Sequence, residues 1–117
     1  MTTNKRQALR LEPSQGHPIK VVFKQKNLQK LSSQIKVLDI SVGGIKLQIP
    51  DAESIVKPEM SIRNMEVSIP DEGICVLTGK VTFIKGEQCG IEFLQSGDHE
   101  INKIARYIFN RERAMRT

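Results

Sequence analysis

Short runs in which apolar and polar residues alternate constrain this chain more than any other feature of its sequence. The clearest runs are residues 19–24, 65–69 and 75–83, where every second residue is apolar. A period of two places these side chains on one face of a β-strand, as in strands with one buried face. Weaker runs at about 33–39, 45–49 and 89–93 bring the predicted total to six strands.

Turn-forming residues separate these runs. Pro50 ends the third run, Pro70-Asp71-Glu72-Gly73 precedes the fifth, and Lys85-Gly86-Glu87 precedes the sixth. We predict a further turn at residues 27–30 and a polar connection over 51–59. Short strands at regular spacing with turns between them favour a small antiparallel β-barrel.

The fifth run is the longest and predicts one continuous buried face. Gly79 within it would allow a bend or bulge, as barrels require at corners. We expect two buried, reduced cysteines, Cys75 here and Cys89 in the sixth run. The residues expected to share the buried face are Cys75, Leu77, Gly79, Val81 and Phe83.

The apolar period changes from two to that of a helix after residue 98. Asp98 or Ser96 can cap the N-terminus of this helix, and arginines in its last turns suit the helix dipole. We therefore predict a C-terminal α-helix over about residues 98–114, packed on the barrel, in a fold that is otherwise all-β. Its apolar stripe consists of Ile101, Ile104, Ala105 and Ile108.

Length and charge narrow the classes of protein further. The chain has 117 residues, enough for one domain with a modest core, and a formal net charge of +5. A basic chain favours an anionic partner. No apolar run is long enough to span a membrane, and the basic N-terminus lacks the apolar segment of a signal peptide, so we expect a cytoplasmic protein.

No constellation of catalytic residues stands out. His17 and His99 are isolated from the cysteines, so a zinc site is not expected. Phosphate-binding loops and nucleophile-elbow motifs are missing from the sequence. We predict that the protein is not an enzyme and has no metal or cofactor.

The stretch D-I-S-V-G-G, residues 39–44, lies between the second and third predicted strands. Gly43 and Gly44 suit a tight turn, in which positive φ favours glycine. Asp39 and Ser41 also suit a turn, because their side chains bond to nearby backbone. Taken alone, this stretch predicts a hairpin turn and nothing more.

The N-terminal arm changes that interpretation. We define the arm as residues 1–13, a polar and basic segment without periodicity that we expect to be flexible; residues 14–117 form the barrel and helix. Arg6 and Arg10 in the arm form an R-x-x-x-R pattern. Three motifs together resemble the PilZ domain family over nearly the whole chain. They are R-x-x-x-R before the first strand, D-x-S-x-x-G after the second strand, and C-G-I-E-F-L in the last strand.

The resemblance implies a receptor for cyclic di-GMP, a ligand with two phosphodiesters and two guanines. The planar arginine fork suits a phosphate or the O6/N7 edge of guanine. A carboxylate can accept from the guanine N1–H and N2–H groups, and glycine lets a ligand approach the backbone. The implied ligand residues are Arg6, Arg10, Asp39, Ser41 and Gly44, with Lys5 and Gly43 as additional candidates.

The resemblance also implies an output through another protein, in motility, biofilm or exopolysaccharide control. We expect the ligand to order the arm on the barrel and so to present a new surface. The chain would act as a monomer or as a ligand-linked dimer. Two alternatives stay open: a PilZ-like adaptor that binds no nucleotide, and a barrel that binds RNA or single-stranded nucleic acid. Four Phe, one Tyr and no Trp argue against the stacking platforms that the last alternative needs.

Overall fold

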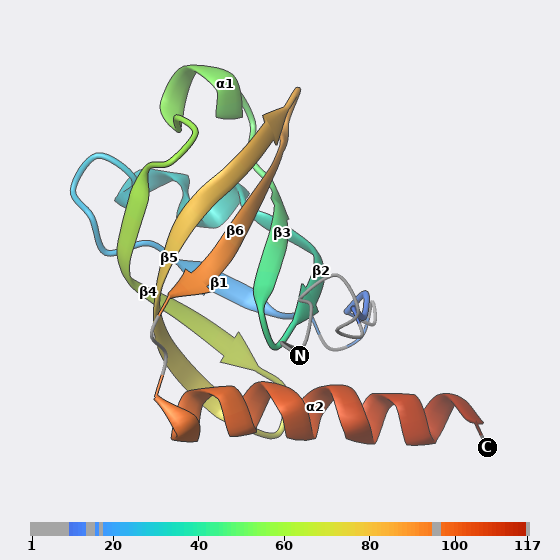
Figure 1. The fold of residues 1–117 in the computed structure, drawn as a ribbon. Coiled ribbons are helices and arrows are strands. Elements are labelled where there is room, and N and C mark those ends of the chain that lie inside the picture. The colour runs from blue at the N-terminus through green and yellow to red at the C-terminus, as the bar shows by residue number, and fades with distance from the viewer. Residues whose placement is uncertain (1–9, 14–15, 17, 95–96, 117) are drawn as a thin grey trace, which may run out of the picture.

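A computed structural model describes residues 10–13, 16, 18–94 and 97–116. Within them six strands form one antiparallel sheet in the order β1-β4-β5-β6-β3-β2. The sheet curls until its two edge strands, β1 and β2, lie beside each other, which makes a nearly closed barrel (Figure 1). The six-stranded barrel predicted from the sequence is confirmed. The strands are β1 (Lys20–Val22), β2 (Lys36–Ser41), β3 (Gly44–Gln48), β4 (Ser61–Ile69), β5 (Gly73–Lys85) and β6 (Gln88–Leu94).

The predicted C-terminal helix is α2 (Asp98–Arg116), which lies across one end of the barrel (Figure 1). Ile104, Tyr107 and Ile108 are buried on its inner face. The helix also covers the part of β5 that extends beyond its pairing with β6. There Val76 N–H donates to Glu100 Oε2 at 2.8 Å, and Lys103 Nζ donates to the Ile74 carbonyl at 3.0 Å. Helix side chains thus satisfy a strand edge that would otherwise be open.

Two short helical elements were not predicted. The 3₁₀ helix η2 (Gln29–Gln34) replaces the expected turn and delays β2 to Lys36, whereas a strand was expected from residue 33. Leu28 just before it is fully buried, so this turn packs inward. The helical turn α1 (Ala52–Ile55) lies in the segment that was expected to be a polar connection. Ala52 and Val56 are buried, so this segment also packs against the core.

The prediction that Phe83 shares the buried face of β5 is wrong. The register between β5 and β6 shifts between Val81 and Phe83, and such a bulge turns the following side chain to the other face. Phe83 is accordingly 43% exposed, and its ring lies over Gly90. Gly79, expected to allow a bend or bulge, pairs with Ile62 where the register of β4 shifts, and it also leaves room for Ile91, whose Cγ2 would be 2.3 Å from an added Cβ.

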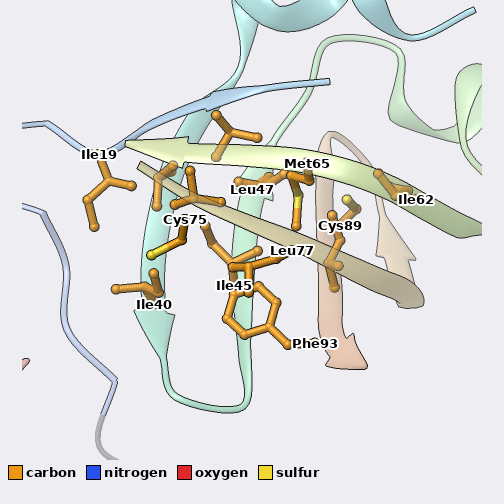
Figure 2. Close-up of a cluster of buried hydrophobic side chains, with 14 of the residues drawn as sticks. Ile19, Ile40, Ile45, Leu47, Ile62, Met65, Cys75, Leu77, Cys89 and Phe93 are labelled. Atoms are coloured by element: carbon orange, nitrogen blue, oxygen red, sulfur yellow. The ribbon is translucent and has the colours of Figure 1, made fainter. Parts of the chain in front are cut away.

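The interior of the barrel is apolar and contains both cysteines. Figure 2 shows Ile40, Ile45, Met65, Leu77 and Phe93 from five different strands meeting there. Cys75 and Cys89 are free and buried, as predicted. Desolvation by burial raises the pKa of each thiol to about 11, and the nearby Glu100 carboxylate adds to this at Cys75.

Both cysteines should therefore resist thiol reagents in the folded protein. At pH 8 a pKa of about 11 leaves roughly one thiol in a thousand ionised, and burial restricts access further. We expect almost no reaction with a chromogenic disulfide reagent in native buffer, and reaction of both thiols in guanidinium chloride. Rapid native modification of either cysteine would contradict this packing.

Candidate functional site

The D-I-S-V-G-G stretch forms the end of the β2–β3 hairpin. Ser41 pairs with Gly44, so Val42 and Gly43 make the turn between the strands. The Ser41 hydroxyl accepts from Gly43 N–H at 3.2 Å and donates to the Gly44 carbonyl at 3.5 Å. Positive φ was expected at both glycines of the turn, but in the part of the chain that the structure describes it is found at Gly73 and Gly86. The turn is therefore stabilised by the Ser41 side chain without left-handed backbone at its glycines.

Gly44 has a structural role that its place in the motif did not reveal. A Cβ at this position would lie 2.5 Å from the Ile91 carbonyl oxygen on β6. Next to it, the Gly43 carbonyl accepts from Phe93 N–H at 2.9 Å. The hairpin end thus packs against the β6 backbone, and a side chain at residue 44 would separate the two strands.

Leu11 joins the arm to the barrel. Its N–H donates to the Ile40 carbonyl at 3.0 Å, and Ile40 N–H donates back to the Leu11 carbonyl at 3.0 Å. The pair is antiparallel, and the Leu11 side chain is buried in the core. Asp39 and Ser41 flank Ile40 on β2, and Arg10 precedes Leu11. Side chains alternate along extended chain, so this pairing places Arg10 over the two flanking polar residues.

The Arg10 guanidinium contacts both of those residues. Its Nε donates to Asp39 Oδ1 at 2.6 Å, and its Nη1 donates to Ser41 Oγ at 3.4 Å. The Arg10 side chain is 43% exposed, whereas that of Asp39 is 20% exposed. Arg10, Asp39 and Ser41 therefore meet at one point on the surface. They were predicted to share one site although they come from segments about thirty positions apart.

The other arm residues assigned to the site, Arg6 and Lys5, lie outside the described residues. Leu11 was not predicted to have a role, because the arm was expected to make no contact with the core. The sequence signal for a core contact here was limited to one apolar residue, Leu11, between Arg10 and the pair Glu12-Pro13.

A groove of about 950 Å³ lies along the seam between β1 and β2, beside this cluster. Asp39 forms part of its wall, together with Glu12 and Pro13 of the arm. Its lysines, Lys20, Lys36 and Lys46, make no ion pair with any described carboxylate. The groove thus adjoins the Arg10 cluster at Asp39, and its three lysines outnumber its two acids, Glu12 and Asp39.

Other kinds of site are not found in the described part of the chain. It contains no group of three or more His, Cys, Asp and Glu side chains placed to hold a metal ion. None of its helices has the length and apolar character needed to cross a membrane.

The PilZ domain family model matches residues 4–110, which is most of the chain. The chain belongs to the PilZ family. The match extends from before Arg6 into α2 and so includes both motifs. No curated protein has a matching sequence.

Solved PilZ structures share the fold. The PilZ domain of YcgR from Escherichia coli, described with c-di-GMP, has a TM-score of 0.70 at 18% identity, with 97% of this chain and 95% of that chain covered. The MrkH–c-di-GMP complex of K. pneumonia has a TM-score of 0.76 at 14% identity, with 97% of this chain and 55% of the MrkH chain covered. MotI/DgrA, the inhibitor of motility of Bacillus subtilis, has a TM-score of 0.68 at 18% identity, with 94% of this chain and 52% of the MotI chain covered. This PilZ chain thus spans about half of the MrkH and MotI chains.

Replacing Gly44 by alanine should destabilise the fold itself. Alanine in place of a strand glycine normally gains about 0.5–1 kcal/mol, but forcing atoms into a packed contact costs about 1–3 kcal/mol. Because the added Cβ would meet backbone rather than a movable side chain, we expect the cost to prevail. Chemical denaturation without ligand would measure it. Gly16→Ala is the matched control, since a Cβ there meets nothing within 4 Å, and equal stability of the two variants would contradict the packing role.

Proposed function

We propose that this PilZ domain is a receptor for cyclic di-GMP and binds it where the arm meets the β2–β3 hairpin. The observation that carries the proposal is the contact of Arg10 with both Asp39 and Ser41. The two halves of the motif are 29 and 31 residues apart at these contacts, so a turn-forming role for Asp39 and Ser41 does not account for it. The c-di-GMP complexes of YcgR and MrkH support the choice of ligand.

Each side chain of the cluster has bonding capacity left for a nucleotide. A guanidinium has five N–H donors, and Arg10 uses two nitrogens on Asp39 and Ser41. Its remaining donors can bind a phosphate or the O6/N7 edge of guanine. Arg10 engages Oδ1 of Asp39, and the other carboxylate oxygen can accept from guanine N1–H or N2–H. Gly44 would serve this site by letting the hairpin end pack closely, and Gly43 by forming the turn.

The groove would hold the body of the ligand. Its volume of about 950 Å³ lies within the range of roughly 300–1,000 Å³ that small-molecule sites span. Arg6 would complete the site from the arm, with Lys5 as an additional contact. Leu11 holds the arm at Ile40, and only three residues lie between Arg6 and Arg10, so the Cα atoms of these two arginines can be at most about 14 Å apart. Ligand binding would therefore order Arg6 close to the hairpin.

The output would pass through a protein partner that recognises the ordered arm. MotI/DgrA is described as an inhibitor of motility and MrkH as a transcription regulatory factor, so PilZ chains of this fold serve different outputs. For this chain we propose a cytoplasmic receptor, monomeric or dimeric through its ligand, without catalytic activity of its own. The process that this receptor would serve is the control of motility, biofilm formation or exopolysaccharide.

Titration calorimetry with cyclic di-GMP, with GMP and single-stranded RNA as controls, tests the function. Arg10→Ala removes charge-assisted hydrogen bonds worth roughly 1.5–3 kcal/mol, so the affinity should fall about tenfold to a hundredfold. The melting temperature should change little, because Arg10 is exposed and Leu11 remains. Arg63→Ala, at an exposed arginine of β4, is the matched control and should bind like the natural chain.

Two results would contradict the proposal. One is the absence of heat with cyclic di-GMP at tens of micromolar protein, a concentration at which micromolar affinity is easily seen. The other is an Arg10→Ala variant that melts earlier but binds as before, because Arg10 would then be a structural residue alone.

A further inference from the structure

Lys46 lines the groove that the nucleotide would occupy and lies across from Asp39 on the neighbouring strand. It is the cross-strand partner of Asp39 on one side and of Gly90 on the other. The neighbour on the Gly90 side carries no charge, and the carboxylate of Asp39 is engaged by Arg10 at 2.6 Å. Lys46 is half-buried, lines the groove and makes no ion pair with a described carboxylate.

Protection of a strand edge explains the other two lysines of the groove but not Lys46. Lys20 and Lys36 lie on β1 and β2, which are the edges of the sheet, and lysine on an edge strand discourages pairing with other chains. Lys46 lies on β3, which is hydrogen-bonded to β2 and β6 on its two sides. Lys46 is thus a half-buried lysine in the interior of the sheet that makes no ion pair with a described carboxylate, and its charge is available to an anion in the groove.

We propose that Lys46 is a further ligand residue of this site and binds a phosphate of the cyclic dinucleotide. This inference rests on the proposed function. If Arg10 and Asp39 recognise a guanine, the adjacent phosphodiester can reach the next strand, where Lys46 lies directly across from Asp39. Lysine acts there as a point charge, which suits a phosphate and does not read a base edge.

The test compares Lys46→Gln, Lys46→Met and Lys46→Arg with the natural chain in titrations with cyclic di-GMP. Gln and Met both remove the charge, and Met keeps the apolar stem, so loss of packing is separated from loss of charge. We expect both to weaken binding about fivefold to tenfold, and Arg to restore it. Lys57→Gln, at an exposed lysine before β4, is the matched control and should bind like the natural chain.

The salt dependence of binding distinguishes a phosphate contact from a structural effect. Between about 50 mM and 300 mM salt the natural chain should lose more affinity than Lys46→Gln, because one screened charge pair is missing in the variant. If the Lys46 and Lys57 variants all bind like the natural chain, Lys46 is not a ligand residue although the receptor function stands. Weak binding by Lys46→Gln with unchanged salt dependence and no restoration by Arg would also overturn the inference. If the natural chain itself does not bind, the receptor function fails first.

Discussion

The backbone pair between Leu11 and Ile40 determines where Arg10 of this PilZ domain lies. Two backbone hydrogen bonds contribute roughly 1 kcal/mol each, and burial of a leucine side chain contributes about 1.5–3 kcal/mol. The Arg10–Asp39 ion pair is partly exposed and contributes about 0.2–1 kcal/mol. Leu11 therefore holds the arm, and the ion pair only orients the arginine. A ligand can then compete for Arg10 and Asp39 without detaching the arm from the barrel.

The groove lies beside the Arg10 cluster because the seam between the edge strands β1 and β2 is open there. Within the described part of the chain β1 and β2 are not paired with each other, and Glu12 and Pro13 of the arm line the groove at this seam. Features that discourage strand addition gather there: β1 has three residues, β2 carries a bulge between Val37 and Asp39, and lysines line both edges. On this edge β2 pairs with the arm only at Leu11, and the remainder of the seam stays open and is lined by lysines. In this fold that surface adjoins Asp39, so the edge lysines Lys20 and Lys36 would also add to the attraction of the proposed anionic ligand.

The overall fold could be predicted from alternation and turn signals, but local irregularities could not. Periodicity located the strands and the helix, because one buried face repeats every two or every 3.6 residues. It failed at Phe83, where a bulge reverses the pattern, and at η2 and α1, where buried Leu28 and Ala52 lie in segments with turn composition. The motif residues Arg10, Asp39 and Ser41 were identified through their resemblance to a family. The structural reason for Gly44 could not be seen, since its neighbour Ile91 is 47 positions away.

The central claim is that a cyclic dinucleotide binds at Arg10, Asp39 and Ser41. It is tested most directly by following the Arg10 Nε–H and backbone amide signals by nuclear magnetic resonance during a titration with cyclic di-GMP. The predicted result is a shift of the Arg10 Nε–H signal together with the amides of residues 39–44, at one common affinity, while the amides of α1 stay unchanged. Shifts confined to other strands, with the Arg10 signal unmoved at saturation, would contradict the claim.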